Sequence, residues 1–428
     1  MKINARFKGH KKESILWYVG IYLFYKVMLE CAYFISVSYW YSYIGFELKP
    51  SISKCIISYI IFVALLFVVP RELSINGQLL NTFFSIAIVP TLSFYWMADK
   101  SLTYVILVVV FFLIFNFIAG IKQKPINILI FENPYKCKIF IDIIFAIYLL
   151  SCIYMGLQRG GIDVRAFSFS TIYDLRSEGT DSGVLEAYLL NWCTKSLFPM
   201  LCIFFLYNEK YIRVIMCMVA QGFMYLCYGY KAYILSAVLT VTIYYVGRYA
   251  CLHKKESNIR NLFIFIIGLL PCCLSRLSGF IGKMAFGINN VYAMRMLFEP
   301  ARIGNGYFEF FSQNEKLHFS EGIIGKLLGL HYPYSEAIGF VVTRYMNGAN
   351  AVSNSNTGII ADSYAELGLI GIFIIAILAG VIVLFIKRIC RSLPSYFVMA
   401  AFFYPVIMLN DNPLLTNLLT DGWVLDII

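Results

Sequence analysis

The sequence predicts an all-α polytopic membrane protein with about 11 to 12 transmembrane helices and two long outer segments. Mean hydropathy is +0.74 and only 14% of the residues are charged, far from the composition of a soluble domain. Apolar runs of roughly 17 to 24 residues recur and do not alternate with polar residues, which argues against an outer-membrane barrel. We interpret residues 1–428 as a single integral membrane domain.

The apolar runs define the expected spans and their orientation. Spans are expected at 15–38, 52–69, 79–97, 101–121, 139–157, 187–207, 212–228, 232–249, 261–275, 362–386, 395–409 and 413–428. Lys and Arg concentrate in alternate links, as in 122–138 and 387–391, which predicts a cytoplasmic amino terminus. Segments 157–187 and 276–361 then share the outer side of the membrane.

Charge and cysteine content narrow the function classes. The net charge of +11 comes from Lys and Arg residues that lie beside the ends of the expected helices. A positive-inside pattern explains this placement, so no nucleic-acid partner is expected. The chain has twelve cysteines, but none lies in either outer segment, so no disulfide is expected within them. We interpret the cysteines as small packing residues.

The outer segment 157–187 is rich in arginine. Arg159, Arg165 and Arg176 lie within 18 residues, on the side where they are not needed for orientation. One interpretation is a solvated loop with weak surface ion pairs. The other is an anion clamp, because guanidinium groups bind phosphate oxygens in a bidentate fork.

The outer segment 276–361 is rich in glycine and is expected to form short amphipathic helices near 290–299 and 336–345. It contains His318 and His331, the only imidazoles expected outside. Histidine suits general-base catalysis near neutral pH, although a surface histidine is an equally good interpretation. No His-x-x-His or His-Glu-x-x-His spacing is present, so no metal site and no cofactor are expected.

Several charged residues at or near span ends allow two interpretations each. Asp362 and Glu366 are four residues apart, and Asp362 either caps a helix or acts as a base. Lys231 either reaches the membrane surface or contacts a lipid phosphate. Lys26 and Glu30 lie on one helix face inside the first span, as a structural ion pair or as part of a substrate path.

The layout resembles the bacterial O-antigen polymerases (the Wzy type, which polymerise oligosaccharide repeat units). The resemblance rests on the number of spans, the arginine-bearing middle outer loop, the large late outer loop, and the Asp-x-Tyr-x-x-x-Gly-x-x-Gly pattern at Asp362, Tyr364, Gly368 and Gly371. It implies a glycosyltransferase bundle similar to the GT-C class in the bacterial inner membrane. It further implies a metal-independent enzyme that transfers a growing glycan from undecaprenyl pyrophosphate to an incoming lipid-linked repeat unit.

The resemblance also implies site residues and partners. The expected pyrophosphate ligands are Arg165, Arg176, Arg276, Arg295 and Lys231. Expected catalytic residues are His331, Glu336 and Asp362, and Tyr173, Tyr332 and Tyr364 are expected to bind sugar. Expected partners are the lipid-linked oligosaccharide, the bilayer and a chain-length regulator protein.

Two other functions use many of the same parts. An O-antigen ligase would share the site but transfer the glycan to a different acceptor. A transporter of lipid-linked oligosaccharide would need a cavity accessible from both sides.

The short outer link at 39–51 has one acid, Glu47, and lacks the acid pair that many lipid-dependent glycosyltransferases place there.

Overall fold

The structure is a computed structural model that describes residues 14–71, 74–122, 134–167, 175, 183–252, 260–390 and 393–423. Within these ranges every regular element is helical, and no strand occurs. Eight helices are long and apolar enough to cross a membrane. The described part of the chain is therefore a helical, multi-pass membrane protein, as the composition predicts.

The first half of the chain contributes the following elements: α1 (Ile15–Ala32), η1 (Tyr33–Val37), α2 (Ser38–Tyr41), η2 (Ser42–Ile44), α3 (Ile52–Val68), α4 (Ile75–Phe83), η3 (Phe84–Ile88), α5 (Val89–Met97), α6 (Leu102–Gly120), α7 (Pro134–Gln158), η4 (Val164–Phe167), α9 (Val184–Asn191), η5 (Trp192–Leu197) and α10 (Phe198–Tyr207). Of these, η1, η3 and η5 are π-helical segments that continue the helices on either side.

The second half contributes α11 (Tyr211–Tyr228), α12 (Ala232–Leu252), α13 (Arg260–Cys272), α14 (Gly279–Asn289), η6 (Asn290–Phe298), α15 (Glu299–Phe311), α16 (Ile323–Leu328), α17 (Ile338–Asn347), α18 (Ile359–Leu367), α19 (Leu369–Ile389), α20 (Ser395–Met408) and α21 (Leu414–Leu419). The segments near 290–299 and 336–345, where short amphipathic helices are expected, correspond to η6 and α17, and both are helical.

Most expected spans coincide with helices, but two differ at the carboxy-terminal end. Besides the eight long helices, α3, the 262–272 part of α13, and α20 are apolar helices of 10–17 residues. The span expected at 362–386 begins only at Leu369, because Gly368 adopts φ 63° and separates α18 from α19. The span expected at 413–428 shows only the six-residue helix α21, and residues 424–428 lie outside the described part.

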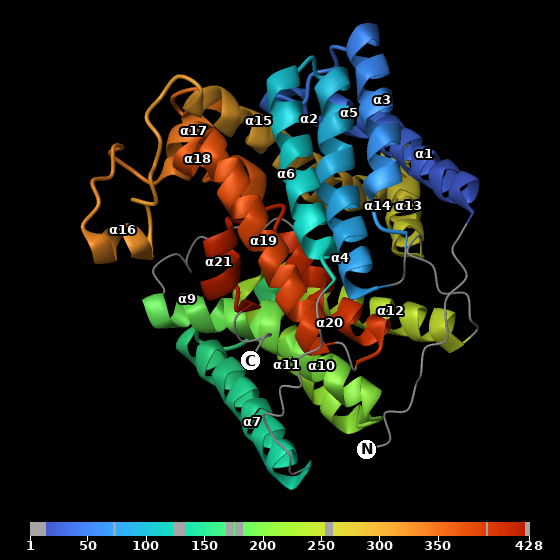
Figure 1. The fold of residues 1–428 in the computed structure, drawn as a ribbon. Coiled ribbons are helices and arrows are strands. Elements are labelled where there is room, and N and C mark those ends of the chain that lie inside the picture. Colours follow the sequence, from blue (N-terminus) through green and yellow to red (C-terminus); the bar gives the residue numbers. More distant parts are fainter. Residues whose placement is uncertain are drawn as a thin grey trace.

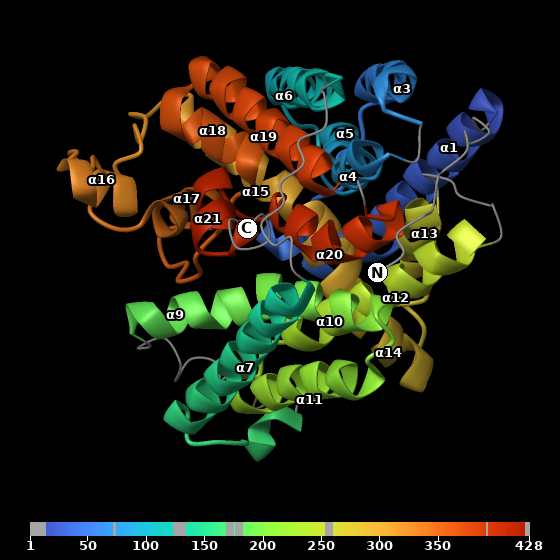
Figure 2. The ribbon, with the colours of Figure 1, turned by 60° about the horizontal axis from the view of Figure 1, so that its bottom comes forward.

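The helices pack around a continuous central rod formed by α4, η3 and α5. In this rod 94% of the residues of the apolar window are buried. Figure 1 shows α3 and α6 beside the rod and the green helices α9–α12 below it, and Figure 2 shows α20 lying between these two groups. Helix α20 packs against α4, α10 and α12, so it joins the two groups of helices.

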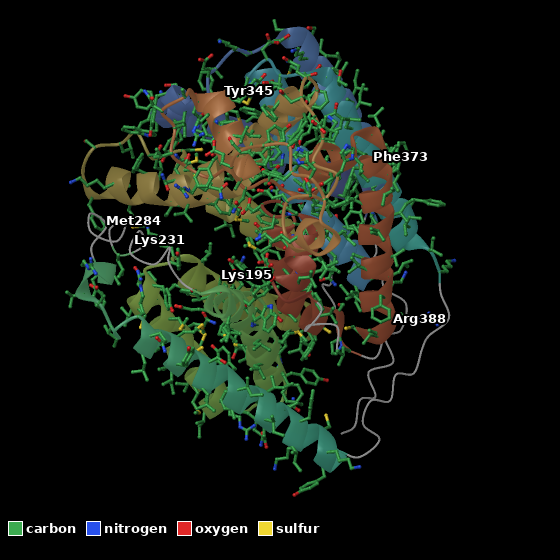
Figure 3. All side chains as sticks on the ribbon, turned by 90° about the vertical axis from the view of Figure 1, so that its left-hand side faces the viewer. Lys195, Lys231, Met284, Tyr345, Phe373 and Arg388 are labelled. Carbon is green, nitrogen blue, oxygen red and sulfur yellow. The ribbon has the colours of Figure 1, made fainter. Side chains whose placement is uncertain are left out.

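The links expected on the outer side contact one another. The backbone N–H of Lys49 donates to the carbonyl of Met97 at 2.8 Å, and Lys100 pairs with Glu309 at 3.8 Å. The backbone N–H of Asp163 donates to the carbonyl of Leu226 at 3.1 Å. In Figure 3, Tyr345 of the segment 276–361 lies near the top of the view, and Arg388, at the carboxy-terminal end of α19, lies well below it. The segment is also tied to the bundle, because α15 is almost entirely buried against α5 and α18.

The Lys26–Glu30 pair is enclosed by α1, α3 and α5. Lys26 is fully buried and Glu30 is 7% exposed. The carboxylate of Glu30 also accepts hydrogen bonds from Tyr59 (2.6 Å), Ser93 (3.1 Å) and Trp96 (2.8 Å). A buried charge costs several kcal/mol unless its hydrogen bonds are satisfied, as they are here. These contacts agree with the interpretation as a structural ion pair.

We expect Lys26→Met to lower the free energy of unfolding by about 3–5 kcal/mol, because it leaves the Glu30 carboxylate buried without its counter-charge. Adding Glu30→Gln should recover much of this loss, since the amide is neutral and keeps an acceptor oxygen. Thermal unfolding in detergent measures both changes. A double variant as unstable as Lys26→Met alone would contradict this account.

Candidate functional site

A cavity of about 270 Å³ lies where three segments that are distant in the sequence meet. The turn between α11 and α12 contributes Lys231, η6 contributes Arg295, and the link after α20 contributes Asp411. Figure 3 shows Lys231 near the level at which the green helices meet the gold segment 276–298. The structure therefore brings together Lys231 and Arg295, two of the expected pyrophosphate ligands.

Local backbone features place the two cations at the cavity. Gly229 ends α11 with φ 70°, and its N–H donates to the carbonyl of Tyr225 at 2.8 Å. This left-handed conformation, which glycine adopts without strain, makes the tight turn that carries Lys231. Arg295 lies on the π-helical segment η6, a helix form often found at functional sites. Its exposed side chain has no hydrogen bond or ion pair with any described residue.

Asp411 is the acid of the cavity, and its surroundings set its protonation. Burial raises the pKa of the Asp411 carboxyl to about 7, with a further contribution from Glu299 and Asp421, while Lys195 and Arg295 oppose the rise. Among the described residues, no hydrogen-bond donor reaches its carboxylate. A carboxyl group that titrates near neutral pH beside two cations can accept a proton from a bound hydroxyl.

A buried network holds the link that carries Asp411. Lys195 of η5 pairs with Asp421 at 2.7 Å, and Asn412 donates to the other oxygen of Asp421 at 2.6 Å. Asp421 is only 1% exposed, so both of its oxygens depend on these partners. Figure 3 places Lys195 deeper in the molecule than Lys231. The network fixes Asn412, and with it the position of Asp411.

The cavity continues along an apolar wall. Leu235 and Leu239 line it from α12, at four-residue spacing after Lys231, and Ile407 lines it from α20. Residues four apart lie on the same face of a helix, so the cationic end and the apolar wall form one strip. This arrangement fits a ligand with an anionic head and an apolar tail.

A second group of ionisable residues surrounds α18. Burial, and then the neighbouring charges of Glu366 and Glu321, raise the pKa of Asp362 well above its ordinary value. Burial raises the pKa of Glu366 to about 7. The Glu321 carboxylate accepts from the N–H of Ile338 at 2.9 Å and so caps α17. In the described part of the chain, no group of three or more His, Cys, Asp or Glu side chains is arranged to hold a metal ion.

The other expected catalytic residues lie outside the cavity. Glu336 forms a bidentate ion pair with Arg344 of α17. His331 is exposed in the link after α16, with no described side-chain hydrogen bond. Tyr332 donates from its hydroxyl to the carbonyl of Glu336 at 2.8 Å.

The remaining expected ligands are dispersed. Arg165 pairs with Asp163 at 2.7 Å on η4. Arg276 stacks on Tyr39, with the guanidinium 4.2 Å from the ring centroid. Lys316 lies 4.1 Å from the ring centroid of Tyr364 and covers one of its faces. Tyr173 and Arg176 lie outside the described residues. The roles expected for these residues stay predictions.

The sequence reasoning did not single out Asp411. It lies between Asn410 and Asn412 in a short link between two expected spans, and no motif surrounds it. Its position in the sequence could have indicated it. An acid that directly follows a span on the expected outer side lies at the same membrane surface as Lys231. No protein-family model matches the chain, and no curated protein or solved structure matches it either.

We expect Glu366→Gln to stabilise the protein increasingly as pH rises from about 5 to 7. The raised pKa means that the native state keeps this proton after the unfolded chain has lost it. Native stability therefore falls with rising pH in this window, by at most about 1.4 kcal/mol per pH unit, and a neutral glutamine removes the loss. Melting temperatures at several pH values test this, with the exposed Glu315→Gln as control. A pH-independent difference from wild type would contradict it.

Proposed function

We propose that this protein is a metal-independent membrane glycosyltransferase that polymerises lipid-linked oligosaccharide repeat units. It transfers the growing glycan from undecaprenyl pyrophosphate to the non-reducing end of the incoming unit, in the synthesis of O-antigen or capsule-type polysaccharide in a bacterial inner membrane. One observation carries the proposal: Lys231 and Arg295 line the same cavity as Asp411, beside the apolar wall of α12.

The two cations suit the departure of a lipid pyrophosphate. When the glycosyl bond breaks, negative charge develops on the pyrophosphate oxygen that leaves the anomeric carbon. Arg295 offers a bidentate fork and Lys231 a compact ammonium, the two forms in which proteins bind phosphate groups. Stabilising the negative charge that develops only as the bond breaks lowers the activation barrier of the reaction directly.

Asp411 is the base that the cavity supports best. The attacking sugar hydroxyl gives its proton to the Asp411 carboxylate while its oxygen forms the new bond to the anomeric carbon. The bond to pyrophosphate breaks in the same step, and its electron pair leaves with the pyrophosphate. Glu336 is paired with Arg344, and burial together with two neighbouring acids raises the pKa of Asp362 well above its ordinary value. His331, exposed on its link, is the competing candidate.

The surroundings of the cavity suit a substrate that arrives within the bilayer. The apolar strip of Leu235 and Leu239 on α12 can cover the first isoprene units while the head group meets Lys231. A transporter is supported less, because the charges inside the first span are enclosed and fully bonded. We further propose that the bundle is similar to the GT-C class of glycosyltransferases.

Purified protein supplied with lipid-linked repeat units in a bilayer should produce a ladder of glycan lengths. Arg295→Ala and Lys231→Ala should each lower the rate by roughly 10²–10³-fold, the usual cost of losing one charge-stabilising donor. Lys283→Ala removes an exposed cation from α14, outside the cavity, and should leave the ladder unchanged. Gel analysis of the lipid-linked products measures all three.

The same assay distinguishes the alternatives. A product formed only with a lipid A core acceptor would indicate a ligase, and movement of the lipid without a new glycosidic bond would indicate a transporter. Ladders of wild-type length from both cavity variants would contradict the assignment of this cavity as the site, even if the protein polymerises.

The identity of the base can be read from the pH dependence. With Asp411 as base, the rate should rise about tenfold per pH unit below 7 and level off above it, because only the carboxylate accepts a proton. Asp411→Asn should remove most of the activity, whereas His331→Ala should keep both the rate and the profile. The reverse outcome would assign the base to His331.

A further inference from the structure

A second, separate pair of cavities lies along the exposed face of α3. One cavity, of about 770 Å³, is lined by residues of α3 from Cys55 to Phe67. The other, of about 480 Å³, is lined by residues 67–71 and by the end of α6. Phe67 lines both, so the shallow hollow along α3 and the cavity at its end adjoin there, and we call the two together the groove. Figure 2 shows α3 and α6 on the same side of the bundle, with α4 and α5 behind them.

The groove is apolar along its length and basic at one end. Ile56, Ile60 and Phe67 are 57%, 64% and 62% exposed, and Phe117 is 73% exposed. Arg71 lines the end of the groove, and no described residue that lines either cavity is acidic. The Arg71 side chain has no hydrogen bond or ion pair with any described residue. Lys387 reaches the carbonyl of Ile121, which also lines this end, at 3.5 Å.

A buried polar group at the same end lacks a partner. Asn116 is 8% exposed, and its Nδ2 donates to the carbonyl of Val68 at 3.1 Å. Its Oδ1 accepts no hydrogen bond, although it is buried beside the cavity that Arg71 lines. An unpaired buried acceptor destabilises the fold, so a ligand hydroxyl that reached it would recover this loss.

We propose that this groove binds one anionic glycerophospholipid. Its phosphate is held by Arg71, a head-group hydroxyl faces Asn116, and one acyl chain lies along α3. From Cys55 to Phe67 the groove spans about 18 Å at the rise of a helix, close to the depth of one leaflet, roughly half of the ~30 Å hydrocarbon core. The site lies at the carboxy-terminal end of α3, away from the outer links and from the Lys231 cavity, and it does not depend on the proposed enzymatic function.

The test uses the full-length protein in detergent, mixed with phosphatidylglycerol and phosphatidylcholine, and native mass spectrometry of the retained lipid. We expect one phosphatidylglycerol to be retained preferentially, and Arg71→Ala to weaken its retention about tenfold, because the variant removes a charge-assisted hydrogen bond to the phosphate. The matched control is Lys210→Ala, an exposed cation in the link before α11. It should retain the lipid as wild type does.

A second variant keeps the proposal testable if Arg71→Ala folds poorly. Ala64→Trp fills the exposed groove with a bulky side chain and leaves Arg71 in place, so it should also lower retention. Equal retention of the two lipids by the wild type would show general lipid contact only and overturn the proposal. Unchanged retention in both variants would also overturn the proposal. Displacement of the lipid by millimolar inorganic phosphate would overturn it too, because it would indicate a site for free anions.

Discussion

The ion pair between Lys195 and Asp421 is the contact on which the candidate site depends. It joins η5, on the green group of helices, to the short segment that follows α21. Asp421 is too deeply buried to rely on water, so its two oxygens must be satisfied by Lys195 and Asn412. Because Asn412 is adjacent to Asp411, this requirement also fixes the acid that faces the cavity.

Charged side chains occur in two contrasting environments in this protein. At Lys26 and Glu30 every charged oxygen has a hydrogen-bond donor, so the pair stabilises the first span and has little capacity left for a ligand. At Arg295 and Asp411 the charged groups face a cavity, and no described residue donates to or accepts from their side chains. Incompletely satisfied charge is costly to the fold, and such sites are commonly functional. This contrast favours the cavity over the first span as the candidate site.

The sequence predicted the helical, membrane-spanning character well, because long apolar runs are a direct consequence of a bilayer. It placed the start of one span too early, because residues 359–367 are also helical and the break at Gly368 depends on backbone conformation. For the site, topology was enough to place Lys231 and Arg295 on one side. Topology could not predict which charged residues lie close together. The pairing of Glu336 with Arg344 and the position of Asp411 in the cavity are set by tertiary packing.

The two acidic groups differ in the charges that surround them. Asp362 has two carboxyl neighbours, Glu366 and Glu321, so ionising it would place like charges together in a buried site. Asp411 also has acids nearby, Glu299 and Asp421, but Lys195 and Arg295 oppose them with positive charge. The pKa of Glu366 and that of Asp411 are both raised to about 7, so protonation alone does not distinguish the two groups. The nearby cations do distinguish them, and they are the reason that we propose Asp411, and not the group around Asp362, as the base for a sugar hydroxyl.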